Sequence, residues 1–99
     1  MIQTKRWKVP LPDGFSLICT KTTAAGKWLN FAVVLRHGDD CVTRYDSADG
    51  APHRDVLGRR EGLIRKEWHE SFSLQNAFEH GIRDLSANYA KYYEYFTSH

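Results

Sequence analysis

The apolar residues in the last third of the chain recur at helical spacing, and this pattern constrains the fold more than any other feature. At about 100° per residue they fall on one stripe, and charged residues occupy the opposite side. The stripe consists of Leu74, Phe78, Ile82, Leu85, Tyr89, Tyr92, Tyr93 and Phe96. Ser71 or Ser73 can cap its start, and Gly81 is its weak point. The sequence therefore predicts one amphipathic helix over about residues 72–97.

The length of this helix has consequences for its packing. Residues 73–97 would span roughly 37 Å at 1.5 Å per residue, which is longer than the body of a domain of this size is wide. The helix can fray or bend near Gly81, its aromatic end can overhang and pack on another molecule, or a curved sheet can accept the whole stripe. Exposed aromatic stripes are uncommon on monomers. One expectation is therefore a homodimer through Tyr89, Tyr92, Tyr93 and Phe96, and the curved sheet is its alternative.

The residues before the helix alternate as β-strands do. Residues 15–22 alternate apolar and polar side chains, and a turn centred on Gly26 should join them to residues 28–37. The second of these segments is apolar on both faces, which predicts a central strand covered on both sides. Residues 41–46 follow as an antiparallel strand, and residues 63–69 form a charged edge strand.

Together these segments predict a single α+β domain over residues 1–99. An antiparallel meander of four to five strands occupies residues 1–70, and the single C-terminal helix covers one face. The hydrophobic share of 41% supplies enough apolar side chains for a core. The net charge of +2 is too small to argue nucleic-acid binding from charge alone.

Composition also sets expectations about the cellular compartment. The longest purely apolar run, residues 31–35, is far below the roughly 18 residues of a membrane span, and the first residues lack the apolar region of a signal peptide. We therefore expect a cytoplasmic protein that does not bind a membrane. Cys19 and Cys41 are expected to be buried thiols, with a disulfide between neighbouring strands as the alternative.

Polar side chains gather in residues 42–58, at the end of a predicted strand. His53 can exchange a proton near neutral pH, and Asp46 could fix its tautomer. Arg44 and Arg54 could stabilise phosphate charge, and Tyr45 could position a substrate. If these groups converge on one hollow, they could support cleavage of RNA without a metal. On that hypothesis, His53→Ala removes activity and leaves the thermal melt unchanged.

Simpler interpretations of these residues stay open. Aspartates beside glycine and proline commonly cap turns, and Arg44 can simply pair with Asp46 or Asp55. Asp46, Asp49, His53 and Asp55 offer ligands for a divalent ion, but their spacing matches no metal motif, so no metal or cofactor is predicted.

Other polar residues and missing motifs add little to the prediction of function. His80 and Asp84 are interpreted as surface support for the helix, and His69 carries no prediction. The motifs of phosphate-binding loops, dinucleotide sites, zinc proteases and serine hydrolases are absent from the sequence.

The order "FAVVL…TRYDSADGAPHRDVL…KEW…AFEHGIRDL…NYAKYYEY", over residues 31–95, resembles a group of small bacterial proteins classed as a domain of unknown function. The shorter pattern of Arg44, Tyr45 and Asp46 followed by Pro52 and His53 is similar to TumE-type toxins of toxin–antitoxin modules. This chain has one histidine where those toxins carry a cluster. The resemblance implies mobile-element cargo that acts on RNA or translation, with an antitoxin as partner.

Two hypotheses about function follow. The first is a toxin-like protein that acts on RNA without a metal, with its site at Arg44, Tyr45, Asp46, His53 and Arg54. The second is a non-catalytic, homodimeric module that binds a ligand or a protein through the aromatic end of the helix. The sequence leaves open whether the protein is an enzyme.

Overall fold

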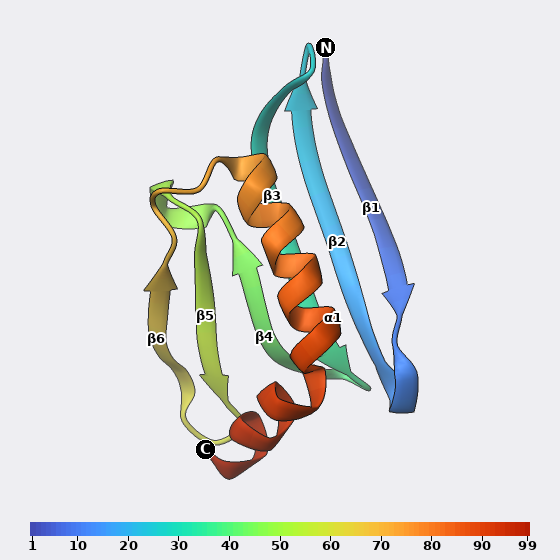
Figure 1. Ribbon diagram of the computed structural model, residues 1–99, viewed down its shortest axis with the longest axis vertical. Helices are drawn as coiled ribbons and strands as arrows, with labels where there is room; N and C mark the ends of the chain where they lie inside the picture. The colour runs from blue at the N-terminus through green and yellow to red at the C-terminus, as the bar shows by residue number, and fades with distance from the viewer.

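The computed structural model describes residues 1–99 apart from the side chain of Asp49. Six strands form one antiparallel sheet in the order β1-β2-β3-β4-β5-β6, and α1 packs across one face (Figure 1). The predicted α+β meander with one C-terminal helix is confirmed, but the expected four to five strands are too few. The elements are β1 (Ile2–Pro10), β2 (Phe15–Ala24), β3 (Lys27–His37), β4 (Asp40–Asp46), β5 (His53–Gly58), β6 (Gly62–Trp68) and α1 (Leu74–Ser98).

The sequence patterns did not reveal β1 and β5. Strand β1 is an edge strand that pairs with β2 along its whole length, from Ile2 opposite Ala24 to Pro10 opposite Ser16. Most of its residues are exposed, so it lacks the clear apolar alternation that marks a half-buried strand. Strand β5 begins with polar residues that look like a turn. It is a strand because β4 and β6 pair with it on both sides.

The core lies between the sheet and α1. Leu17 and Cys19 of β2 and Val33 and Leu35 of β3 are fully buried there, against Leu85 of α1. The expectation that β3 is covered on both sides was wrong. Its other face stays partly exposed at Ala32 and Val34, because the helix packs on one face of the sheet only. Small and β-branched side chains fit such a half-buried strand without a second layer over them.

The turn at Gly26 and the start of the helix agree with the sequence. Ala25 and Gly26 have φ angles of 51° and 78°, as in the type I′ turns that match the twist of a tight hairpin. The side chain of Ser73 accepts a hydrogen bond from the Asn76 amide at 3.1 Å. Ser73 is therefore the N-cap.

The helix bends at Asn88 and not at Gly81. Asn88 has non-helical angles of φ −125° and ψ 18°, and beyond it the last turns of α1 change direction toward the ends of β5 and β6 (Figure 1). Gly81 stays helical and lets the sheet approach: a Cβ there would lie 3.1 Å from Cγ of Tyr45. Gly81, which was expected to weaken the helix, is therefore the point where helix and sheet come into close contact.

Because of the bend, the aromatic stripe packs on its own sheet. The rings of Tyr89 and Tyr93 lie 4.8 and 5.3 Å from the ring of Phe15, and Phe96 is buried. The structure thus corresponds to the alternative in which the sheet accepts the stripe. A homodimer through Tyr89, Tyr92, Tyr93 and Phe96 stays a prediction.

The two cysteines are free thiols. Cys19 is buried, and burial raises the pKa of its thiol to about 11; Cys41 is partly buried. In the described part of the chain, no helix is both long enough and apolar enough to cross a membrane.

Candidate functional site

The pairing of β4 with β5 divides the predicted site residues between the two faces of the sheet. Tyr45 lies opposite Arg54, and Asp46 lies opposite His53. Successive side chains of a strand point to opposite faces. Arg44, Asp46 and His53 therefore lie on the open face, and Tyr45 and Arg54 lie beneath α1. The prediction that these groups converge on one hollow was wrong.

On the open face, charged side chains surround the imidazole of His53. We call Arg44, Asp46, His53, Asp55 and Lys66 the His53 cluster. Nε2 of His53 lies 3.0 Å from Oδ1 of Asp46 and 3.3 Å from Oδ1 of Asp55. Lys66 donates to Oδ1 of Asp55 at 2.8 Å, and Arg44 donates to Oδ2 at 2.6 Å. Two carboxylates thus face two cations around one ring.

The ring of His53 is closed off from solvent. Its exposure is 0%, and Nδ1 donates to the carbonyl oxygen of Ala51 at 2.9 Å. The indole ring of Trp68 lies 5.0 Å away. A general acid or base must reach its substrate, so a catalytic role for His53 would require this cluster to open.

The cluster also holds the carboxylate of Asp55 charged. Burial raises the pKa of the Asp55 carboxyl, but the hydrogen bonds from Lys66 and Arg44 outweigh burial and leave that pKa below its ordinary value. In the described part of the chain, Asp46, His53 and Asp55 are the group whose ligand atoms come close enough to hold a metal, within 4.8 Å of one another. The side chain of Asp49, a further candidate ligand, lies outside the described residues.

On the helix side, Asp84 of α1 collects the hydroxyl groups of two tyrosines. Tyr45 and Tyr92 donate to its Oδ2 at 2.7 and 2.6 Å, and Asn88 donates to its Oδ1 at 2.8 Å. Burial raises the pKa of Asp84, but these three hydrogen bonds outweigh burial and lower it overall. Burial and the carboxylate together raise the pKa of Tyr92 to about 12. Both phenols therefore stay protonated at neutral pH.

Arg54 connects this network to the sheet. Its guanidinium donates to Oε1 of Glu67 at 3.1 and 2.9 Å and to Oγ1 of Thr43 at 2.9 Å. It also lies 4.6 Å from the centre of the Tyr92 ring, at the distance of a cation–π contact. Arg54 is buried and held on several sides, so its charge has a fixed position.

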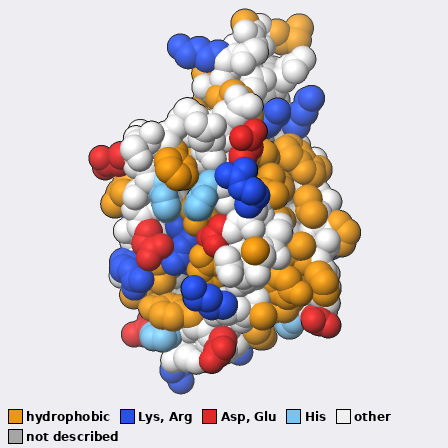
Figure 2. All heavy atoms as spheres, viewed as in Figure 1, with side chains coloured by type: hydrophobic (Ala, Val, Ile, Leu, Met, Phe, Trp, Pro, Cys, Tyr) orange, Lys and Arg blue, Asp and Glu red, His pale blue; other side chains and the backbone are white. Residues whose placement is uncertain are grey.

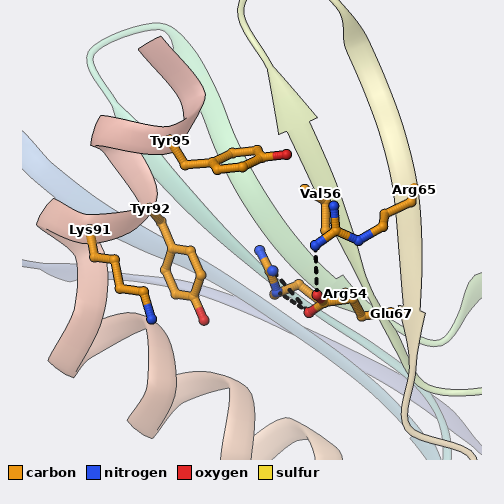
Figure 3. Close-up of a pocket in the computed structure, with 7 residues that line it drawn as sticks. All are labelled: Arg54, Val56, Arg65, Glu67, Lys91, Tyr92 and Tyr95. Carbon is orange, nitrogen blue, oxygen red and sulfur yellow. Dashed lines mark hydrogen bonds and ion pairs between the residues drawn. The ribbon is translucent and has the colours of Figure 1, made fainter. Parts of the chain in front are cut away.

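A hollow of about 340 Å³ lies between α1 and strands β5 and β6 (Figure 3). Tyr92, Tyr95 and Lys91 enter it from the helix, opposite the strand residues (Figure 3). Arg65 donates to Oε2 of Glu67 at 3.2 Å, so this carboxylate serves two arginines. The hollow is lined by Arg54, Val56, Arg65, Glu67, Lys91, Tyr92 and Tyr95. Three cations and one carboxylate give it a positive balance.

Two histidines lie beside this network. Nε2 of His80 is 3.4 Å from the Tyr45 hydroxyl, and the rings of His80 and His69 are 5.5 Å apart. Figure 2 shows neighbouring histidine side chains at the surface of this face, close to acidic and basic groups. Burial, and then the nearby His80, lower the pKa of His69. Its Nε2 is buried and has no hydrogen-bond partner among the described residues.

Sequence reasoning did not place these histidines and Asp84 around Tyr45, and it did not find the hollow. His80 and Asp84 have the i, i+4 spacing of an ordinary surface pair, and His69 follows a charged strand. One signal in the sequence could have pointed to them: both histidines lie near the junction of β6 and α1. Only packing shows that this junction lies over Tyr45.

The fold and its polar hollow define a two-layer α+β protein without a recognised catalytic motif. A family model described as Domain of unknown function (DUF7718) matches residues 3–99, and the chain belongs to this family. No curated protein and no solved structure matches the chain. The resemblance to an uncharacterised family is thus confirmed. The similarity to TumE-type toxins is not shown by these comparisons.

Removing the buried imidazole should destabilise the fold. We expect His53→Ala to lower the free energy of unfolding by about 3 kcal/mol, because it leaves a cavity and takes a partner from the buried Asp55 and the partly exposed Asp46. Urea denaturation of the wild type and the variant measures this difference. In a double-mutant cycle, Asp46→Ala should cost less in the His53→Ala background than in the wild type. An unchanged thermal melt for His53→Ala would contradict the packing described above.

The hydrogen bonds to Asp84 should make stability depend on pH. Its pKa is lowered in the folded state, so it stabilises the fold above the unfolded-state pKa of about 3.9, and this contribution is lost as pH falls through the folded pKa. We expect Asp84→Asn to be less stable than the wild type at pH 7, with the gap narrowing toward about pH 2. Urea unfolding at several pH values measures the gap. The exposed Asp39→Asn is the control, and a gap independent of pH would refute the argument.

Proposed function

We propose that the protein binds a phosphate-bearing ligand, with single-stranded RNA as the main candidate, in the hollow between α1, β5 and β6. The observation that supports this most is the lining of the hollow, where Arg54, Arg65 and Lys91 accompany the rings of Tyr92 and Tyr95. Cations hold phosphates, and aromatic rings stack on unpaired bases.

The charges of the hollow favour an anion. Glu67 is the single carboxylate of its lining, and it is bonded to Arg54 and Arg65 together. Lys91 is exposed and makes no ion pair with another described residue. It is therefore available to a phosphate. This local excess of charge matters more for binding than the modest net charge of the whole chain.

The size and shape of the hollow favour a single strand over a duplex. A hollow of about 340 Å³ is at the lower end of the range for small-ligand pockets and suits one nucleotide unit. In a duplex the bases are stacked on each other and cannot reach a tyrosine ring, whereas a single strand can turn a base out.

A more specific proposal is that the protein also cleaves the bound RNA without a metal, as a toxin-like protein would. His80 is partly exposed, and it lies within reach of the Tyr45–Asp84 pair. It replaces His53 as the acid–base group, because the ring of His53 is buried. In this scheme His80 takes the proton of the 2′-hydroxyl, and the oxygen attacks the adjacent phosphorus. The 5′-oxygen then leaves with a proton from water, and the hydroxide left behind takes the proton back from His80. The products are a 2′,3′-cyclic phosphate and a 5′-hydroxyl.

Binding is tested with a short, fluorescently labelled single-stranded RNA followed by anisotropy. We expect Lys91→Ala and Arg65→Ala each to weaken binding about fivefold and to reduce the slope of log K against log salt by about 0.7, because each removes one phosphate contact. The matched control is Lys8→Ala, since Lys8 is exposed on β1 at the opposite edge of the sheet. Equal affinities for Lys91→Ala and Lys8→Ala would refute binding in this hollow.

Cleavage is tested on the same RNA in denaturing gels, with a chelator present. We expect the wild type to produce fragments ending in a 2′,3′-cyclic phosphate, and His80→Ala to lose cleavage while retaining RNA affinity. His37→Ala is the control, because His37 does not line the hollow and packs against Phe15 and Tyr93. Intact RNA with the wild type, or full cleavage by His80→Ala, would rule out this chemistry and leave the binding proposal standing.

A further inference from the structure

We infer that Asp46, His53 and Asp55 form a binding site for a divalent transition-metal ion on the open face of the sheet. This site is separate from the proposed RNA-binding hollow, because the sheet lies between them. One nitrogen and two carboxylate oxygens are ligands that Mn²⁺, Co²⁺ and Zn²⁺ accept, whereas Mg²⁺ and Ca²⁺ prefer oxygen alone.

The distances between the donor atoms suit a shared ion. Around a metal with bonds of about 2.1 Å, ligands at octahedral or tetrahedral angles lie about 3.0–3.4 Å apart. Nε2 of His53 is 3.0 Å from Oδ1 of Asp46 and 3.3 Å from Oδ1 of Asp55. All three atoms lie within 4.8 Å of one another, so a small rotation of the partly exposed Asp46 completes the set.

Outer hydrogen bonds already orient two of the three ligands. The carbonyl oxygen of Ala51 accepts from Nδ1 of His53 at 2.9 Å, which leaves Nε2 directed at the carboxylates. Arg44 holds Oδ2 of Asp55 at 2.6 Å and leaves Oδ1 turned toward the imidazole. Metal-binding histidines and carboxylates are usually held by outer partners of this kind. The side chains are thus preorganised before any ion arrives.

A cation already sits among these atoms. Nζ of Lys66 lies 2.8 Å from Oδ1 of Asp55 and 3.3 Å from Nε2 of His53. Its side chain is 25% exposed and is carried on a flexible stem. We infer that the ammonium group occupies the place of the metal and swings outward when an ion binds. Lys66 therefore competes with the metal and sets its affinity.

The site meets solvent at Asp46, whose side chain is partly exposed, whereas His53 and Asp55 are buried. Asp46 lines a hollow of about 450 Å³ together with Ser47, Ala48 and residues of β2 and β3. The hollow has room for waters that complete the coordination of the ion, as expected of a site with three protein ligands.

The experiment is calorimetric titration of chelator-treated protein with Mn²⁺, Co²⁺ and Zn²⁺, together with the visible absorption of Co²⁺. We expect one ion per chain in the wild type and at least about tenfold weaker binding in Asp46→Asn. Lys66→Met should bind about tenfold more tightly than the wild type, because it removes the competing ammonium group and keeps the length of the side chain. The control Lys8→Met, on the edge strand β1, should match the wild type.

Three results would overturn the inference. The first is no saturable binding in either the wild type or Lys66→Met. The second is equal affinity in the wild type and Lys66→Met. The third is binding that survives in Asp46→Asn and disappears in His80→Ala, which would place the ion at the His69–His80 pair. Circular dichroism of each variant verifies that it is folded, and none of these readouts depends on RNA binding.

Discussion

The register between β4 and β5 is the constraint on which the rest of the structure depends. Tyr45 lies opposite Arg54 and Asp46 opposite His53, so neighbouring residues of one short polar segment point to opposite faces. A shift of one residue would turn one of the two strands over relative to the other. It would place His53 and Asp55 on the face of Tyr45, under the helix, and separate His53 from Asp46. Both polar clusters therefore result from the same ladder of backbone hydrogen bonds.

The bend of α1 at Asn88 is the second decisive feature. The amide of Asn88 donates to the backbone oxygen and to the carboxylate of Asp84, in the turn where the helix changes direction. Asp84 can then accept the hydroxyls of Tyr45 and Tyr92 together. The same bend brings Tyr95 and Lys91 over β5 and β6, where they close the hollow. A straight helix would carry these side chains past the edge of the sheet.

Several elements could be predicted because their signals are local. Helical spacing defined α1, Ser71 or Ser73 marked its start, and Gly26 marked a tight turn, since each depends on residues close in sequence. The edge strand β1 could not be found this way, because an exposed strand needs no apolar face. Strand β5 was missed for a different reason. Its first residues, His53 to Asp55, are polar, and they are buried through partners on β4, β6 and α1.

The sequence by itself determined the class of fold, the place of the helix and the segment in which polar groups gather. These follow from periodicity and turn chemistry, which act over a few residues. Only the tertiary structure decided which of the polar groups meet. Tyr45 and Arg54 join residues about 40 positions further along the chain, such as Asp84 and Tyr92, while Arg44 and His53 turn away from them. Such contacts depend on strand register and on the helix bend, which emerge when the sheet and the helix pack together.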